Sequence, residues 1–228
     1  MGKNDNGNNG RTELVFVVDR SGSMGGLESD TIGGFNSMLS KQRTIAGECR
    51  VTTLLFDHRI ETLHNPLDIR EVNDLTSRDY WVRGSTALLD AIGLAIDRMI
   101  VTQRHTAAAY RAQHVLFVII TDGYENASRR YSLHQIKQMI TYERERYHWE
   151  FVFLGANIDA EQTAGDFGIS PRCATDFHAD GQGIKASFEA VACAATAVRG
   201  GADLDDLSAP DFLGGVRDDY RSRRRMKR

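Results

Sequence analysis

Residues 115–120 have the sequence VLFVII, the most apolar run in the chain, and Thr121, Asp122 and Gly123 follow it directly. An apolar run without polar alternation is typical of a strand that is buried on both faces of a sheet. Such a strand requires helices on both faces, because each face must be covered by apolar side chains. We therefore predict that 115–120 is an inner strand of a parallel sheet in an α/β protein.

The segments on either side of this run alternate between strand patterns and helix patterns. The predicted strands are 13–19, 50–56, 59–63, 150–154 and 172–177, and the predicted helices are one that ends near Arg43, 88–99, one that begins at Ser132, 160–167 and 184–195. Residues 64–84 show no period and are predicted to form a long connection. The alternation predicts an open, doubly wound, mostly parallel α/β sheet with helices on both faces.

The composition is that of an ordinary folded protein. The 228 residues are 41% hydrophobic and 26% charged, and the net charge of −3 gives no global attraction to nucleic acid or an acidic membrane. We predict one domain, 12–200, between a disordered tail at 1–11 and an extension at 201–228 that ends in a free, arginine-rich tail. Three widely spaced cysteines and the lack of any long apolar run predict a reduced, cytoplasmic protein that does not enter a membrane.

Oxygen-bearing side chains follow two predicted strands and precede one predicted helix. They are Asp19, Ser21 and Ser23 in the pattern D-x-S-x-S, Thr86 in Gly-Ser-Thr, and Asp122 in Thr-Asp-Gly. Each piece alone is equally typical of helix capping or of a turn. In a doubly wound sheet, however, ligands bind at the carboxyl ends of the strands, so we expect the five side chains to converge. Five oxygens without nitrogen or sulfur favour a hard cation, Mg²⁺ above all, with Mn²⁺ or Ca²⁺ as alternatives.

These motifs, in this order, resemble the metal-ion-dependent adhesion site of von Willebrand factor A domains, and the chain is similar to small stand-alone bacterial proteins of that family. The resemblance covers roughly residues 12–200. It implies a doubly wound fold with one divalent cation, for which Ser21, Ser23 and Thr86 supply hydroxyls while Asp19 and Asp122 act directly or through water. The loop before Thr86 departs from the pattern, because Arg83-Gly84-Ser85 stands where many relatives have two glycines.

Three neutral hydroxyls and two carboxylates leave a dication with appreciable positive charge. A partner protein can then supply an Asp or Glu carboxylate in place of a water molecule, so we expect a metal-dependent protein-binding module, an adaptor rather than an enzyme. Exposed loop residues beside the ion are expected to form the partner-binding rim. They are Arg20, Met24, Trp81, Arg83, Tyr124 and Glu125.

Two other functions remain open at this point. One is an Mg²⁺-dependent hydrolase or phosphotransferase that uses the same ion, for which Glu125 is the nearest candidate base. The other is nucleic-acid binding through the basic tail, which we consider the weaker alternative because only Tyr220 offers an aromatic ring there.

Overall fold

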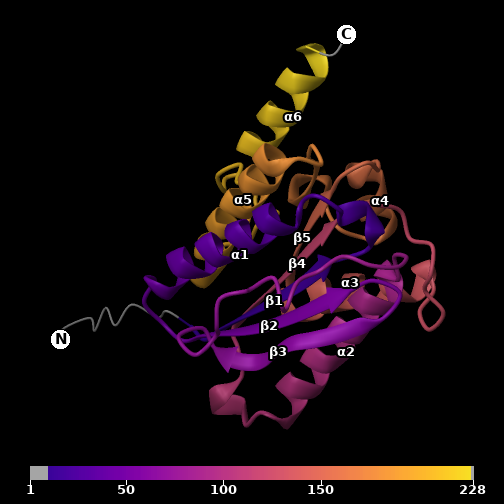
Figure 1. Ribbon diagram of the computed structural model, residues 1–228. Helices are drawn as coiled ribbons and strands as arrows, with labels where there is room; N and C mark the ends of the chain where they lie inside the picture. Colours follow the sequence, from indigo (N-terminus) through magenta and orange to yellow (C-terminus); the bar gives the residue numbers. More distant parts are fainter. Residues whose placement is uncertain (1–9, 227–228) are drawn as a thin grey trace.

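The structure is a computed structural model that describes residues 10–226, and it contains a six-stranded sheet (Figure 1). The strands are β1 (Thr12–Asp19), β2 (Cys49–Phe56), β3 (Ile60–Asp68), β4 (His114–Thr121), β5 (Glu150–Gly155) and β6 (Ala174–Asp176). The helices are α1 (Glu28–Arg43), α2 (Leu88–His105), α3 (Leu133–Tyr147), α4 (Ala160–Asp166), α5 (Gly181–Arg199) and α6 (Gly214–Met226). Short 3₁₀ turns lie at η1 (Gly22–Met24), η2 (Ala108–Tyr110) and η3 (Pro171–Cys173).

The strand order is β3-β2-β1-β4-β5-β6. Among the strands of residues 10–226, β3 alone runs antiparallel to its neighbour, and all other neighbouring strands are parallel. The prediction of an open, doubly wound, mostly parallel sheet is therefore confirmed. The chain moves outward from β1 in one direction to β2 and β3, and then crosses to β4 on the other side of β1. The carboxyl ends of β1 and β4 consequently lie next to each other at the point where the strand order reverses, which is where such folds bind ligands.

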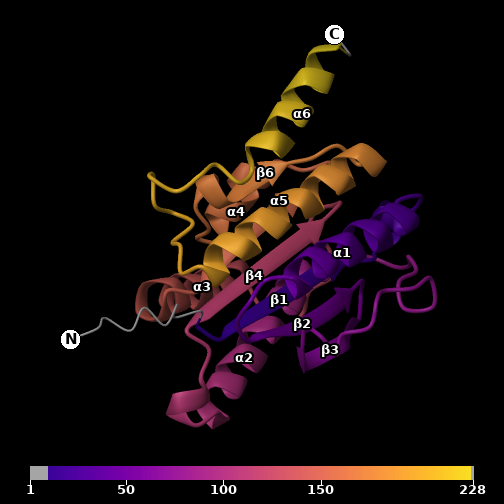
Figure 2. The same cartoon turned by 90° about the vertical axis from the view of Figure 1, so that its left-hand side faces the viewer.

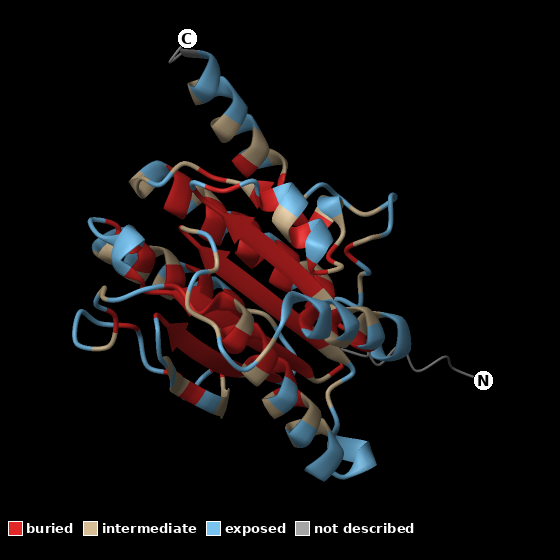
Figure 3. Ribbon diagram, turned by 90° about the vertical axis from the view of Figure 1, so that its right-hand side faces the viewer, coloured by how far each residue is buried: buried red, intermediate tan, exposed pale blue. Residues whose placement is uncertain are grey.

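Helices cover both faces of the sheet. Helices α1 and α5 lie side by side on one face, and α2 and α3 lie on the other (Figures 1 and 2). Strands β1, β2, β4 and β5 between them are almost entirely buried (Figure 3), whereas the edge strand β3 is mostly half-buried. On the first face, the Phe35 ring of α1 lies 5.2 Å from that of Phe16 on β1 and 6.2 Å from that of Phe188 on α5, so one aromatic cluster joins both helices to the sheet.

Local signals placed most elements correctly, but β3 is longer than predicted and α6 was not predicted. Strand β3 continues to Asp68, beyond the predicted end at residue 63, because its pairing with β2 resumes after register irregularities between Val51 and Leu54. Helix α3 begins as the capping box predicts. The Ser132 hydroxyl accepts a hydrogen bond from the Gln135 N–H, and the Ser132 N–H donates to Gln135 Oε1 at 2.8 Å.

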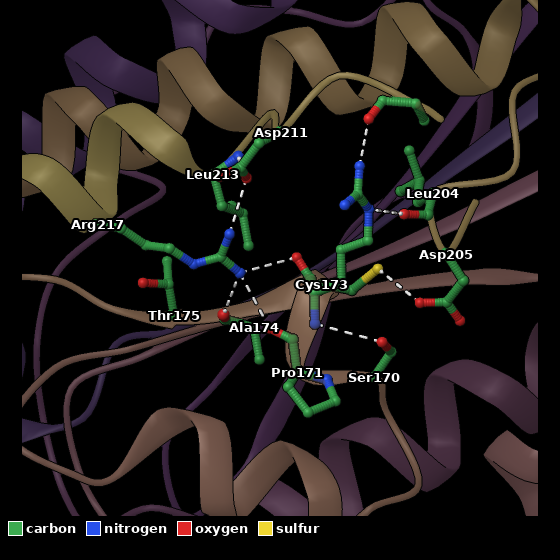
Figure 4. A network of polar contacts seen from close by, with 12 residues as sticks. Ser170, Pro171, Cys173, Ala174, Thr175, Leu204, Asp205, Asp211, Leu213 and Arg217 are labelled. Carbon is green, nitrogen blue, oxygen red and sulfur yellow. Dashed lines mark hydrogen bonds and ion pairs between the residues drawn. The ribbon is translucent and has the colours of Figure 1, made fainter. Parts of the chain in front are cut away.

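The arginine-rich segment does not hang free in the described residues, so that expectation is wrong there. Residues 214–226 form α6, which docks on the body through the buried Val216, through the buried Leu213 just before the helix, and through Arg223, which pairs with Asp180. Arg217 Nη2 donates to the carbonyl oxygens of Pro171, Arg172 and Ala174 at 3.0–3.1 Å (Figure 4). The far end of α6 projects beyond the body (Figure 2).

The predicted disordered tail falls almost wholly on residues 1–9, which lie outside the described residues. Of its last two positions, Gly10 is buried and Arg11 pairs with Glu48. Among residues 10–226, no helix has both the length and the apolar character that a membrane crossing requires.

Candidate metal-ion site

The loop after β1 folds back on itself at the carboxyl end of the strand. The Ser21 N–H donates to Asp19 Oδ1 at 2.6 Å, which turns the chain directly after the strand. The hydroxyl oxygens of Ser21 and Ser23 then lie 3.0 Å apart. Thus the alternation D-x-S-x-S places both serine hydroxyls on the same side of the turn.

The loop before α2 lies against this first loop. The Gly22 N–H donates to the Gly84 carbonyl at 3.1 Å, and the Arg83 N–H donates to the Arg20 carbonyl at 2.9 Å. Gly84 has φ +67°, a left-handed conformation that favours glycine. The two backbone bonds bring Thr86, at the end of this loop, beside the serines.

The third loop completes the cluster at Gly123. A Cβ at this glycine would lie 3.3 Å from Ser23 Oγ and 3.8 Å from Thr86 Oγ1, so the open side of Gly123 faces hydroxyls of both other loops. The preceding Asp122 N–H points towards Asp19 Oδ2, at 3.4 Å. The structure therefore brings together all five residues that the motifs single out.

The two carboxylates of the cluster are buried and lack a cationic partner among residues 10–226. Asp19 Oδ2 accepts from the Thr121 hydroxyl at 2.7 Å, and Asp122 Oδ1 accepts from Asn157 Nδ2. Burial raises the pKa of Asp19, although the hydrogen bonds from Thr121 and Ser21 oppose it. Burial also raises the pKa of Asp122 to about 6, against the hydrogen bond from Asn157 and with the added repulsion of Asp19.

This donor set fits a hard divalent cation. Two carboxylates without protein countercharge, together with three neutral hydroxyls, match the oxygen ligands that Mg²⁺ and Ca²⁺ prefer. Within the described part of the chain, no group of three or more histidine, cysteine, aspartate or glutamate side chains is arranged to hold a metal. The cluster would therefore hold a cation through hydroxyls as much as through carboxylates.

The structure corrects part of the predicted rim. Arg20 and Met24 are fully buried, so they cannot contact a partner, and the expectation for these two residues is wrong. Tyr124 is 62% exposed, and Trp81 is 43% exposed beside the partly exposed Arg83, whose guanidinium lies 4.3 Å from the indole centroid. These three side chains remain available beside the site.

Glu125 is partly buried and its carboxylate is occupied by backbone groups. It accepts from the N–H of Leu89 at 2.9 Å, from the N–H of Ala127 at 2.8 Å, and from both the N–H and the hydroxyl of Ser128 at 2.7 Å. The residue thus ties the third loop to the first turn of α2. It is neither a free rim residue nor a free base.

Asp57 is the main residue that sequence reasoning missed. It is fully buried, and its Oδ2 accepts from Arg20 Nε at 3.1 Å and from Arg83 Nε at 2.8 Å. Its carbonyl oxygen also accepts from the Ala87 N–H at 2.9 Å. Burial acts to raise the pKa of Asp57, but the hydrogen bonds from Arg83 and from the Arg59 N–H outweigh it and hold the pKa below its usual range.

A signal for Asp57 was present in its position. Like Asp19 and Asp122, it is an aspartate at the end of an apolar strand, but it lies between the predicted strands 50–56 and 59–63 and outside the quoted motifs. Arg20 is buried because it spans the β2–β3 hairpin, with Nη2 donating to Glu61 at 2.7 Å. Asn157, which follows β5, was also missed, and no motif distinguishes it in the sequence.

Comparison with known proteins tests the resemblance. Neither a scan against protein-family models nor a search of curated proteins gave a match. Among solved structures, the chain is similar to a von Willebrand factor type A protein from Catenulispora acidiphila, with 10% identity and a TM-score of 0.53 over 80% of this chain and 42% of that one. The chain has the von Willebrand factor A fold. The chain is also similar in structure to the ArnB paralog VWA2 from Sulfolobus acidocaldarius, with 17% identity and a TM-score of 0.51 over 79% of this chain and 45% of that one.

A third similar structure carries a metal. It is proximal thread matrix protein 1 from the mussel byssus with a zinc-occupied MIDAS motif, which has 13% identity and a TM-score of 0.54 over 82% of this chain and 46% of that one. The chain therefore spans less than half the length of each of these three relatives of the von Willebrand factor A fold. At these identities the likeness concerns the fold.

Proposed function

We propose that this chain is a divalent-metal-dependent protein-binding module, an adaptor in the cytoplasm that engages an Asp or Glu of a partner protein through bound Mg²⁺. The supporting observation is the position of Gly123, whose open side faces the hydroxyls of Ser23 and Thr86 while Asp122 and Asp19 lie next to it. Five oxygen donors from three loops thereby share one site. A zinc-occupied site in a protein of the same fold supports a divalent ion there.

The chemistry of the donor set explains why such an ion would recognise an acid. The two carboxylates only just balance a dication, and a carboxylate that binds through water rather than directly leaves the cation with appreciable positive charge. Mg²⁺ requires six ligands and usually retains water, and a carboxylate from outside replaces one water with a charged ligand. Ser23 is exposed, which leaves this side of the site open to a partner.

The alternative of an Mg²⁺-dependent hydrolase or phosphotransferase loses support from the placement of Glu125. That carboxylate accepts hydrogen bonds from three backbone N–H groups and one hydroxyl, so it is not poised to take a proton from water. We found no second observation that favours catalysis, and the binding module is therefore the function we put forward.

Calorimetric titration with Mn²⁺ tests the proposed ion site. Asp19→Ala and Thr86→Ala should each weaken binding at least about tenfold, whereas Thr86→Ser keeps the hydroxyl and should bind nearly as well as wild type. Ser222→Ala, an exposed hydroxyl on α6, is the matched control. Equal Mn²⁺ affinity in wild type and in folded Thr86→Ala would disprove the site.

A pull-down from native lysate then tests the partner. Proteins retained in Mg²⁺ should be released by EDTA and should not bind Asp19→Ala. A native partner that stays bound in EDTA would refute metal-dependent recognition, even where Mn²⁺ binds as expected.

A further inference from the structure

A groove of about 410 Å³ opens directly beside the candidate metal site. It begins at Gly123 and Tyr124 of the third loop and continues between the first turns of α2 and α3 and along α4. Gly123 belongs to both features, because its open side faces the hydroxyls of Ser23 and Thr86 and the residue also lines the groove. A chain bound at the ion would therefore continue into this groove.

The groove has an apolar floor and an apolar rim. Leu88, Ile158 and Phe167 form part of the floor and are each less than 9% exposed. Leu133 and Tyr124 stand at its edge with 43% and 62% of their surfaces exposed. Large apolar side chains exposed together around a hollow are typical of interaction sites.

The wall next to the metal site is held in place before any partner arrives. Glu125 ties the third loop to the Leu89 N–H of α2, and the buried Asp90 accepts from the N–H groups of Arg129, Arg130 and Tyr131 at 2.8–2.9 Å. A preformed wall reduces the ordering cost that binding must overcome.

The far part of the groove carries negative charge. Asp159 caps the N-terminus of α4 and Asp166 is its last residue, so about 10 Å of helix separates them. Both are exposed, and neither lies within ion-pair distance of a cationic side chain of residues 10–226. Asp159 also lines a second pocket with Arg217, Arg221 and Arg224 of α6, so Asp166 is the carboxylate that is open to a ligand. A dication at one end and the Asp166 carboxylate at the other favour a ligand of opposite polarity along the groove.

We propose that the groove recognises an extended segment of the partner in which the metal-binding Asp or Glu is followed in space by a large apolar side chain and then by Lys or Arg. The apolar side chain packs between Tyr124 and Leu133, and the basic side chain pairs with Asp166. This inference rests on the proposed function, because the metal supplies the first of the three contacts. It adds a specificity that the ion alone cannot provide, since any exposed carboxylate binds a cation.

Selection from random twelve-residue peptides displayed on phage tests the proposal. Phage are captured on the Mg²⁺-loaded protein and eluted with EDTA, and enriched sequences are synthesised with a fluorescent label. We expect them to share an acidic residue, a large apolar residue and a basic residue. Peptide affinity is then measured by fluorescence anisotropy, and Mn²⁺ affinity by calorimetry for every variant.

Two groove variants and two matched controls separate the contacts. Leu133→Ala should weaken peptide binding about tenfold, whereas Leu207→Ala, an exposed leucine outside the groove, should not change it. Asp166→Lys should weaken binding to a similar degree, and a peptide whose basic residue is replaced by Glu should recover it. Asp218→Lys on α6 is the charge control, and all four variants should bind Mn²⁺ like wild type.

The outcomes distinguish this proposal from the proposed function. In one outcome, the peptides that elute with EDTA share only an acidic residue and bind both groove variants like wild type. That result would overturn the groove proposal and leave metal-dependent binding intact. If no peptide elutes with EDTA although Mn²⁺ binds, both metal-dependent recognition and the groove proposal fail. Loss of Mn²⁺ binding in Leu133→Ala or Asp166→Lys would also refute the groove, because the effect would then come from the ion site.

Discussion

Asp57 Oδ2 accepts a hydrogen bond from Arg83 Nε at 2.8 Å, which fixes the loop that carries Thr86 to the end of β2. The same oxygen accepts from Arg20 Nε of the first loop at 3.1 Å. One buried carboxylate thus sets the spacing between two loops that bring hydroxyls to the candidate metal site. Buried charged hydrogen bonds are costly to break, because removal of one partner leaves the other charge uncompensated.

We predict that Asp57→Ala lowers Mn²⁺ affinity about 10- to 100-fold although it removes no metal ligand. The two arginines lose their common acceptor, and the loops that they hold move apart. Calorimetric titration measures the affinity. Asp57→Asn, which keeps the shape of the side chain without its charge, should fall between Ala and wild type.

A matched control separates positioning from simple loss of stability. Ile140→Ala removes a fully buried side chain of α3, and it should lower the free energy of unfolding by about 2–5 kcal/mol with unchanged Mn²⁺ affinity. Wild-type Mn²⁺ affinity in folded Asp57→Ala would show that the carboxylate has no positioning role.

Gly123→Ala tests the packing at the centre of the site. The added methyl group would lie 3.3 Å from Ser23 Oγ, so this hydroxyl must shift by a few tenths of an ångström, whereas the 3.8 Å to Thr86 Oγ1 is an ordinary contact. We expect Mn²⁺ affinity to fall about tenfold or more. Gly165→Ala on α4, where a Cβ meets nothing within 4 Å, should leave the affinity unchanged. Equal affinities for the two variants would contradict the assigned geometry.

The buried carboxyl group of Glu13 should make the free energy of unfolding depend on pH. Glu13 is 2% exposed on β1, and its Oε2 has no hydrogen-bond partner among the described residues. Burial raises its pKa to about 7, against the charges of Arg50 and Arg11. Because the folded-state pKa exceeds that of the unfolded chain, the protonated carboxyl stabilises the fold fully below about pH 4.5, and this contribution is lost as the pH rises through about 7.

Glu13→Gln mimics the protonated form at every pH. It should be more stable than wild type by on the order of 2–3 kcal/mol at pH 8 and differ little from it near pH 4.5. Urea unfolding at both pH values measures the difference. A difference that stays constant between the two pH values would rule out Glu13 as the titrating group.

The contacts of Arg217 indicate that α6 contributes to the free energy of unfolding. The Nη2 of Arg217 donates to three carbonyl oxygens around η3 and β6, and its Nη1 donates to Asp211 at 2.8 Å. Arg217→Ala should lower the free energy of unfolding by about 1–3 kcal/mol, because those carbonyls lose their donor. The exposed Arg221 on the same helix is the control, and Arg221→Ala should have almost no effect. Indistinguishable urea curves for the two variants would mean that α6 is only loosely attached.

The chain order of strands and helices up to α5 was evident in the sequence, because the signals for them are local. The apolar run at 115–120 and the Ser132–Gln135 capping box each specify an element within a few residues. The same holds for the motif residues Asp19 and Asp122, which follow apolar strands in sequence and so lie at carboxyl ends in the fold.

What the sequence by itself determined is therefore the doubly wound sheet and which five oxygen-bearing residues gather at one edge of it. Only the tertiary structure decided how other polar groups pair around them. Arg20 looked like an exposed loop residue, yet it bonds to Asp57, 37 positions away, and is buried by the β2–β3 hairpin. Arg217 likewise looked free, yet it bonds to carbonyls more than 40 positions earlier. Short-range periodicity carries no information about such pairs, because the three-dimensional packing of distant segments selects each partner.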